Sequence, residues 1–238
     1  MTAADRHLAW AACLNIRDLG GLRTQDGRLT KHGVLVRASM IGTLTDDGAA
    51  AMRSHGVRTV IDLRWPVEVE AQPSMFAKGA AYRNVPVDAD RNLALLDHAS
   101  AGTMRMQLET LTQPSSGIRD AILAVAASDP AVVIHCQAGR DRTGIVTALV
   151  LTAAGVVDED IEADYCASDE ALAGEYARLS REQPGETVGM PGAVERRKVL
   201  MGQVLRTMRE AYGDARSYLA ALGVTPVATD RLRWMLVG

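Results

Sequence analysis

The chain has 238 residues, of which 47% are hydrophobic and 23% are charged, and its formal net charge is -3. This length suits one sizeable α/β domain and does not require a second, so we expect a single domain over residues 1–238. The slightly negative charge argues against a broad nucleic-acid-binding surface, and we expect no nucleic-acid partner.

The first half of the chain alternates strand-like and helix-like patterns. A run of β-branched residues is typical of a central strand buried on both faces, and glycine and proline mark the turns between runs. The expected elements are a turn at 15–21, a short strand at 34–37, a helix from about 45 to 55, a central strand at 57–63 and a short strand at 83–87.

The second half continues this alternation and then becomes helical. The expected elements are a helix at 116–127, a second central strand at 131–135, and helices at 144–154, 158–181, 193–212, 214–222 and from about 225 onward. Strands that alternate with helices favour a parallel sheet with helices on both faces. We therefore predict an α/β fold with a central, mostly parallel sheet of about four to five strands, flanked by helices, and a helical C-terminal third.

No segment predicts stable membrane insertion. The longest apolar run, residues 144–157, is shorter than the roughly 20 residues of a membrane-spanning helix, and the first residues carry no apolar signal core. The three cysteines, Cys13, Cys136 and Cys166, form no close pair, which indicates neither a disulfide framework nor a metal site. We expect a reduced, cytoplasmic protein. The sequence leaves the oligomeric state open.

Residues 135–144, HCQAGRDRTG, carry the strongest functional signal. They lie between a β-branched strand and an apolar helix, with five residues between Cys136 and Arg142. A loop that enters a helix N-terminus points backbone N–H groups into one concavity, which suits a phosphate dianion. The same groups favour a thiolate at Cys136.

Each residue of this loop has an expected chemical role. Arg142 presents a planar fork to two phosphate oxygens, and Thr143 can donate its hydroxyl to the sulfur. The expected phosphate-binding residues are Gln137, Ala138, Gly139, Arg140 and Gly144, whose two glycines allow a tight turn and a close backbone approach. The predicted reaction is a double displacement through a phosphocysteine, with no metal and no cofactor.

The loop resembles that of the protein tyrosine phosphatase superfamily. More narrowly, it is similar to the bacterial branch that includes mycobacterial phosphatase B and the lipid phosphatases of intracellular bacteria, whose loops read HC-x-x-G-K-D-R-T-G. Further similar segments are NIRDLGG at 15–21, VLVRAS at 34–39, VIDLR at 60–64 and the tail at 210–236. Arg140 stands where the family commonly has lysine, which keeps the charge and changes the hydrogen-bonding geometry.

The resemblance implies a phosphomonoester hydrolase and a helical lid, with lid elements near 98–115 and 181–210. The alternative for these segments is ordinary core packing of Met104, Met106, Met201 and Met208. The expected substrate is a phosphotyrosine-type, phosphoinositide or small-molecule phosphate. The alternative substrate is a nucleotide or sugar-phosphate metabolite. Two other classes are less favoured. A rhodanese-like sulfurtransferase also uses a loop cysteine but would not require Arg142 and Thr143 at this spacing. A non-catalytic phosphate-binding module would be indicated by loss of the nucleophile or the arginine, and both are present.

The general acid has two candidates. Many tyrosine phosphatases use the aspartate of a Trp-Pro-Asp loop, but here Val67 follows Trp65-Pro66 and cannot donate a proton. We interpret Trp65-Pro66 as a strand exit. Asp141 is the preferred acid, because the similar family carries an aspartate there with that suggested role. An ion pair with Arg140 is the alternative role of Asp141.

Asp88, which follows a predicted strand, is the alternative acid, or else a turn or helix cap. His135 is expected to orient the loop through a buried hydrogen bond, with direct proton transfer as the alternative. Buried ion pairs that brace the scaffold, with contacts to the site as the alternative, are expected of Arg17, Asp18, Asp62 and Arg64. Aromatic walls for a phosphotyrosine are scarce, and the candidates are Tyr82 and Trp65.

Overall fold

The computed structural model describes residues 6–79, 81–87, 115–182 and 193–238. In chain order these form β1 (Arg17–Asp18), β2 (Leu35–Ala38), the 3-10 helix η2 (Ile41–Thr43), α1 (Asp46–Ser54), β3 (Thr59–Asp62), α2 (Pro66–Ala71), β4 (Tyr82–Asn84), α4 (Ser116–Ala126), β5 (Val132–His135), α5 (Asp141–Ala153), α6 (Asp158–Glu182), α7 (Ala193–Tyr212), α8 (Ala215–Ala221) and α9 (Pro226–Leu236).

The strands form one mostly parallel sheet, in the order β1-β2-β5-β3-β4. Only β1 runs antiparallel to its neighbour among the paired strands of the described chain. The register places Ala38 of β2 and Asp62 of β3 on either side of His135 in β5. The carboxyl ends of three parallel strands are therefore level, and such an edge is where open α/β sheets bind ligands. The predicted fold class is confirmed.

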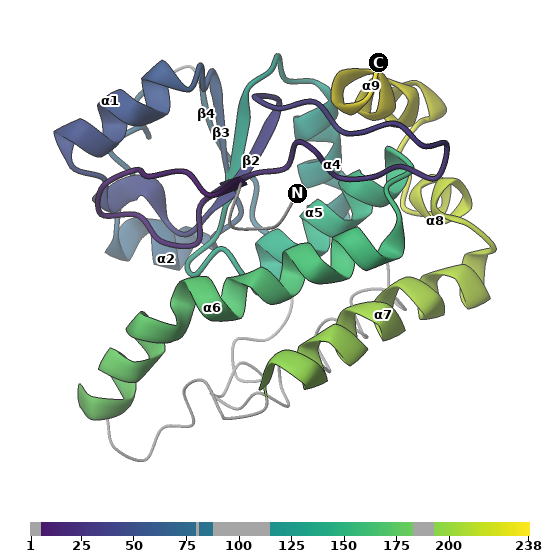
Figure 1. Ribbon diagram of the computed structural model, residues 1–238. Helices are drawn as coiled ribbons and strands as arrows, with labels where there is room; N and C mark the ends of the chain where they lie inside the picture. The colour runs from purple at the N-terminus through teal and green to yellow at the C-terminus, as the bar shows by residue number, and fades with distance from the viewer. Residues whose placement is uncertain (1–5, 80, 88–114, 183–192) are drawn as a thin grey trace.

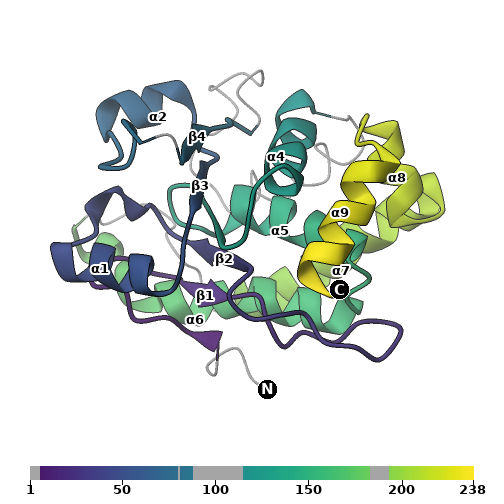
Figure 2. The same ribbon diagram turned by 90° about the horizontal axis from the view of Figure 1, so that it is seen from above.

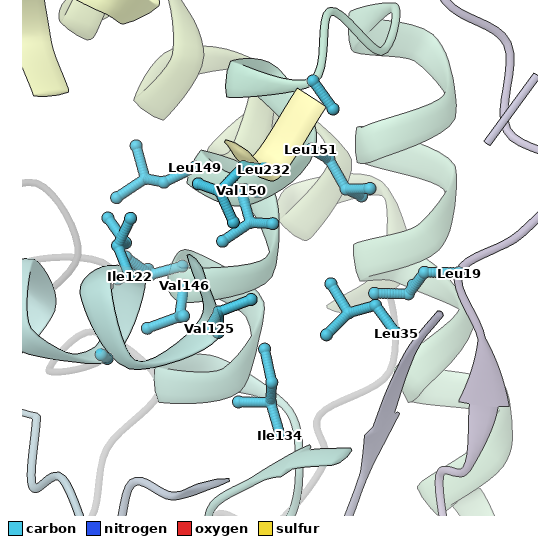
Figure 3. Packing of buried hydrophobic residues seen from close by; sticks show 14 of the residues in the cluster. Leu19, Leu35, Ile122, Val125, Ile134, Val146, Leu149, Val150, Leu151 and Leu232 are labelled. Carbon is cyan, nitrogen blue, oxygen red and sulfur yellow. The ribbon is translucent and has the colours of Figure 1, made fainter. Parts of the chain in front are cut away.

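Alternate residues of the strands enter two hydrophobic clusters, as the period of a strand requires. On one face Leu35 and Ile134 pack with α4 and α5, which contribute residues such as Val125, Val146 and Val150 (Figure 3). On the other face Val36 and Val133 pack with Trp10, Ile16 and Met52. Figures 1 and 2 show α1 on one side of the sheet and α4, α5, α8 and α9 on the other.

One predicted helix start agrees with the structure and another differs from it. Thr45 caps α1, since its hydroxyl accepts a hydrogen bond from the backbone N of Gly48 at 3.2 Å. Helix α5 begins at Asp141, three residues before the predicted start at 144, because the loop passes directly into the first helical turn. Helix α6 packs against both α5 and α7, and its Asp164 pairs with Arg37, which donates a hydrogen bond to the loop.

The interpretation of Trp65-Pro66 as a simple strand exit is wrong. Pro66 is the first residue of α2 and Trp65 is its N-cap. Proline fits the first turn of a helix because its missing N–H has no intrahelical partner there. The Glu68 side chain accepts the Trp65 backbone N–H at 2.8 Å and completes the cap. This short helix places an acidic side chain next to the loop.

Three predicted features fall partly or wholly outside the described residues. Asp88 and nearly all of the expected lid segment at 98–115 are among them, and so are residues 183–192 of the second lid segment. Within the part of the chain that the structure describes, no helix is long and apolar enough to span a membrane.

Candidate functional site

The loop 136–140 connects the end of central strand β5 to the first turn of α5. It therefore lies at the level carboxyl edge of the sheet, between the ends of β2 and β3. Cys136, its first residue, is only 3% exposed. The loop residues that follow Cys136 run into a helix N-terminus, whose dipole favours negative charge.

The four carbonyl groups of residues 137–140 all accept hydrogen bonds from the surrounding scaffold. Their donors are Met40 N to residue 137 (2.9 Å), Asn15 Nδ2 to residues 138 and 139 (3.0 Å each), Arg37 Nη2 to residues 139 (2.7 Å) and 140 (3.1 Å), and Gly144 N to residue 140 (2.7 Å). In a trans peptide the C=O and the next N–H point in opposite directions. The N–H groups of residues 138–141 are thus turned toward the other side of the loop, an arrangement that binds anions.

Two glycines make this geometry sterically feasible, as predicted. Gly139 has a φ of 67°, and a Cβ there would lie 2.1 Å from the carbonyl oxygen of Ala38. A Cβ on Gly144 would lie 2.7 Å from the ring of Tyr165. The loop at Gly139 and the helix at Gly144 can approach their neighbours this closely only without side chains.

Arg142 is held by Glu68 of α2 in a bidentate ion pair. Nη1 donates to Oε2 at 2.5 Å and Nη2 donates to Oε1 at 2.8 Å. The ring of Trp65 lies 4.8 Å from the guanidinium carbon, within cation–π range. Burial lowers the pKa of Arg142, but the hydrogen bonds to Glu68 and the nearby Cys136 and Asp141 raise it overall, so the group stays charged. Glu68 was not among the predicted site residues.

Thr143 follows Arg142 and is completely buried. Its hydroxyl has no hydrogen-bond partner among the residues that the structure describes. A buried hydroxyl without a partner is costly, and in a functional site it marks a group available to a ligand or a reacting atom. This is compatible with the predicted role of Thr143 toward the sulfur.

Asp141 and Arg140 form the ion pair that was the alternative interpretation of Asp141. Arg140 Nε lies 3.2 Å from both carboxylate oxygens, and Tyr165 donates its hydroxyl to Oδ1 at 2.9 Å. Arg140 also donates to the hydroxyl of Tyr176 at 2.5 Å and lies 5.2 Å from its ring centroid. Burial, opposed by Arg140 and aided by Asp141, raises the pKa of Tyr176 to about 12.

The aromatic surroundings of the loop therefore come from three residues. Trp65 was a candidate and contacts Arg142, whereas Tyr82 uses its hydroxyl to donate to Asp62 at 2.7 Å. Tyr165 and Tyr176, both on α6, were not predicted. Their position depends on how α6 packs against α5, which no local sequence pattern indicates.

His135 packs directly beneath the loop. Its Nδ1 lies 3.1 Å from the carbonyl oxygen of Cys136, and its Nε2 lies 3.7 Å from Asp62. Burial lowers the pKa of His135, although Asp62 opposes that shift. Asp62 in turn forms a fully buried ion pair with Arg64 at 2.7 Å. The expected buried contact of His135 and the expected ion pairing of Asp62 and Arg64 are both present.

A second charge cluster lies behind the loop. Asp164 of α6 pairs with Arg6 at 3.0 Å, Arg17 at 2.9 Å and Arg37 at 2.7 Å. Burial would raise the pKa of Asp164, but these three guanidinium groups hold it well below its ordinary value. Burial also lowers the pKa of Arg17 to about 10, although Asp164 opposes this.

The predicted bracing role of Arg17 thus has a partner that the sequence did not identify. Asp164 is one of several acidic residues in the predicted helix 158–181, and nothing local distinguishes it from a solvent-exposed one. Asp18 instead accepts the backbone N–H groups of Gly20 at 2.6 Å and Gly33 at 2.7 Å, and lies 3.2 Å from His55.

Asn15 and Arg37, which hold the loop carbonyls, belong to the segments NIRDLGG and VLVRAS that carried the resemblance. That resemblance was therefore the available signal for both. Among the described residues, no cluster of His, Cys, Asp and Glu side chains could hold a metal ion.

Comparison with known proteins gives consistent matches over most of the chain. The model of the tyrosine phosphatase family matches residues 8–238. A tyrosine-protein phosphatase of Nostoc commune is 29% identical, over 83% of this chain and 72% of its own length. The triple specificity protein phosphatase PtpB of Mycobacterium tuberculosis is 28% identical, over 94% of this chain and 96% of its own length. The solved structure of P. aeruginosa TpbA is 14% identical, over 88% of this chain and 91% of its own length, with a TM-score of 0.38.

Proposed function

The chain belongs to the tyrosine phosphatase family and is a phosphatase, and we propose that it hydrolyses phosphate monoesters through a phosphocysteine formed on Cys136. The observation that carries this proposal is the loop itself. Its carbonyls are bonded outward and its N–H groups point inward, around a buried cysteine at a helix N-terminus.

In the first step the phosphate dianion occupies the loop and Cys136 Sγ attacks phosphorus. The bond from phosphorus to the ester oxygen breaks, and Asp141 transfers its proton to that leaving oxygen. Arg142 binds the equatorial oxygens. A guanidinium has five N–H donors and Glu68 accepts two of them, so the other three can serve the phosphate while Glu68 holds the group in place.

In the second step water attacks the phosphocysteine. The water gives its proton to the Asp141 carboxylate, the sulfur–phosphorus bond breaks, and inorganic phosphate forms. Thr143 donates its hydroxyl hydrogen bond to the departing thiolate, a role for which its unpartnered buried hydroxyl is suited. No step requires a metal or a cofactor.

We propose a phosphotyrosine-type monoester as the substrate, with a phosphoinositide or another multiply charged phosphate as the alternative. The aromatic rings of Trp65 and Tyr176 lie on the two arginines of the loop region, where an aryl leaving group would find apolar contact. Arg140 supplies a second cation beside the loop, which would favour a substrate with a second negative charge.

The decisive experiment measures hydrolysis of an aryl phosphate with and without a chelator. We expect chelator-insensitive turnover that is lost in Cys136→Ser, while Cys166→Ser, a change of the same kind on α6, keeps it. Mass spectrometry of rapidly quenched wild-type enzyme should detect the phosphocysteine. Full activity of Cys136→Ser, or loss of activity with the chelator, would contradict the mechanism. Thiosulfate turnover without phosphatase activity would favour the sulfurtransferase.

The role of Asp141 has its own test. A general acid acts in its protonated form, so Asp141→Asn should flatten the basic limb of the kcat/KM profile. It should also make the rate depend more steeply on the basicity of the leaving group. If both features match those of the wild type, Asp141 serves only as the partner of Arg140.

A further inference from the structure

Asn15 has an unusual backbone conformation and a fully used side chain. Its φ is 53°, in the left-handed region that few residues other than glycine adopt, and it is 2% exposed. Oδ1 accepts a hydrogen bond from Arg17 at 2.5 Å, and Nδ2 donates to the carbonyl oxygens of Ala138 and Gly139. Because the Arg17 guanidinium can only donate hydrogen bonds, the Asn15 atom that it contacts must be the oxygen, and the amide nitrogen therefore faces the loop.

Arg37 completes the same arrangement from β2. Its Nη2 donates to the carbonyls of Gly139 and Arg140, and its Nη1 donates to Asp164. Asp164 also binds Arg17, so one carboxylate orients both of the arginines that act on the loop. The three buried guanidinium groups around Asp164 place positive charge on the side of the loop opposite its inward N–H groups.

The two peptides that flank Gly139 are the ones most at risk of turning over. Glycine has no Cβ to resist rotation, and its positive φ is only one of several accessible conformations. A peptide that rotates by half a turn would point its carbonyl into the loop and its N–H away. The rotated peptide would then present a carbonyl oxygen that repels the anion in place of an N–H that attracts it.

We propose that Asn15 and Arg37 are positioning residues that fix the loop peptides in their anion-binding orientation and thereby set the affinity for the phosphoryl group. Neither residue touches the substrate in this arrangement. They act through the carbonyls of residues 138–140, with Asp164 and Arg17 as their supports. This inference rests on the proposed function, because it assigns these residues to the loop that carries Cys136.

The test uses Asn15→Gly, which removes the amide and keeps a residue that tolerates the left-handed backbone. Competitive inhibition by inorganic phosphate, measured against an aryl phosphate, reports the affinity of the loop. We expect it to weaken roughly tenfold or more, as for lost hydrogen bonds that serve a charged ligand. KM should rise because the loop N–H groups bind the phosphoryl group in the ground state, and kcat should fall because they bind it more strongly in the transition state.

The matched control is Asp18→Asn, a buried change three residues away whose carboxylate contacts Gly20, Gly33, His32 and His55, on the far side of β1 from the loop carbonyls that Asn15 bonds. It should lower stability while leaving phosphate inhibition unchanged. Asn15→Gly with the phosphate inhibition of the wild type would overturn the proposal. So would an equal loss of phosphate inhibition in Asp18→Asn.

Arg37→Lys provides a second variant should Asn15→Gly fail to fold. It keeps the charge but cannot bond both loop carbonyls and Asp164 with the fixed fork of a guanidinium. It should also weaken phosphate inhibition, and unchanged inhibition would contradict the proposal. An active Cys136→Ser contradicts the proposed function, whereas an inactive Cys136→Ser combined with normal phosphate inhibition in either positioning variant contradicts this inference alone.

Discussion

The loop has two very different sides. The rear brace, consisting of Asn15, Arg17, Arg37 and Asp164, is between 1% and 3% exposed and connects β1, β2 and α6. The front rim, consisting of Glu68, Arg140, Asp141, Arg142 and Tyr176, is partly open, with side chains of Arg142 and Glu68 12% and 22% exposed. Both sides are built from ion pairs, yet their surroundings differ.

Because the rear brace is more deeply buried than the front rim, we expect substitutions in the brace to affect stability and substitutions in the rim to affect turnover. Removing one member of a buried ion pair leaves an uncompensated charge and costs roughly 3–5 kcal/mol, whereas exposed pairs contribute about 0–1 kcal/mol. The rear brace should therefore control whether the loop forms. The front rim lies in partly open surroundings, so changes there should affect turnover more than stability.

The largest expected effect is that of Asp164→Asn in the rear brace. We expect the free energy of unfolding in urea at pH 7 to fall by roughly 3–5 kcal/mol, because three buried arginines lose their carboxylate. The control is Asp230→Asn, the same change at an exposed pair with Arg216, which should cost less than about 1 kcal/mol. Equal losses in both variants would remove the distinction between the two sides.

The same variant has a defined pH dependence. The folded-state pKa of Asp164 lies below its unfolded value, so its contribution is present at neutral pH and is lost as the pH falls below about 4. Wild-type stability should therefore decline more steeply between about pH 5 and pH 3 than that of Asp164→Asn. Parallel curves for the two proteins would contradict the assignment of the buried charge.

Gly139→Ala tests the close approach of the loop to β2. Its Cβ would lie 2.1 Å from Ala38 O, whereas Gly27, which has a φ of 82°, has open space around it. Gly27→Ala thus carries the backbone strain without the clash. We expect Gly139→Ala to be less stable than Gly27→Ala by roughly 1–3 kcal/mol in thermal or urea unfolding. Similar losses would indicate that only the backbone conformation matters.

Glu68→Gln tests the front rim. The amide cannot form the bidentate ion pair with Arg142, so we expect kcat/KM for an aryl phosphate to fall roughly tenfold while stability changes by less than about 1 kcal/mol. Glu70→Gln, an exposed change on the same helix, is the control and should behave like the wild type. A large stability loss in Glu68→Gln would place Glu68 with the rear brace.

The smallest expected effect is that of Tyr176→Phe. It removes the hydroxyl that accepts from Arg140 and keeps the ring that lies over the guanidinium. We expect stability within about 0.5 kcal/mol of the wild type and a change in KM of only about twofold. Tyr176→Ala, which also removes the ring, should raise KM further, since the cation–π contact is lost. Equal KM values for the two variants would remove any role for the ring.

The features predicted correctly from the sequence are those that depend on local residue patterns. Periodicity gave the strands and helices, and the spacing of Cys136 and Arg142 marked the loop between them. Pro66 was misjudged because a proline that stops a strand and one that begins a helix look alike without the following contacts. Glu68 was missed for the same reason, since its role appears only once α2 turns toward the loop.

The partners of the loop depend on tertiary packing. Asp164 meets Arg17 and Arg37 only because α6 packs beside α5, and the register of β2 against β5 brings Arg37 to the loop carbonyls. Any acidic residue in the helix 158–181 could have filled this place on sequence grounds. Which one does so is decided by helix rotation and crossing, which local patterns do not encode.

The rear brace also has a consequence for the biogenesis of the protein. Asn15 and the loop carbonyls it binds are separated by 123 and 124 positions, and Arg17 and Asp164 by 147. During synthesis the ribosome releases the N-terminal arginines long before it releases the aspartate that neutralises them. A nascent chain that ends before α6 would lack Asp164, so its guanidinium groups would be unpaired and Arg37 could not hold the loop peptides in their anion-binding orientation. Catalytic competence should therefore arise late, in one step, when α6 docks.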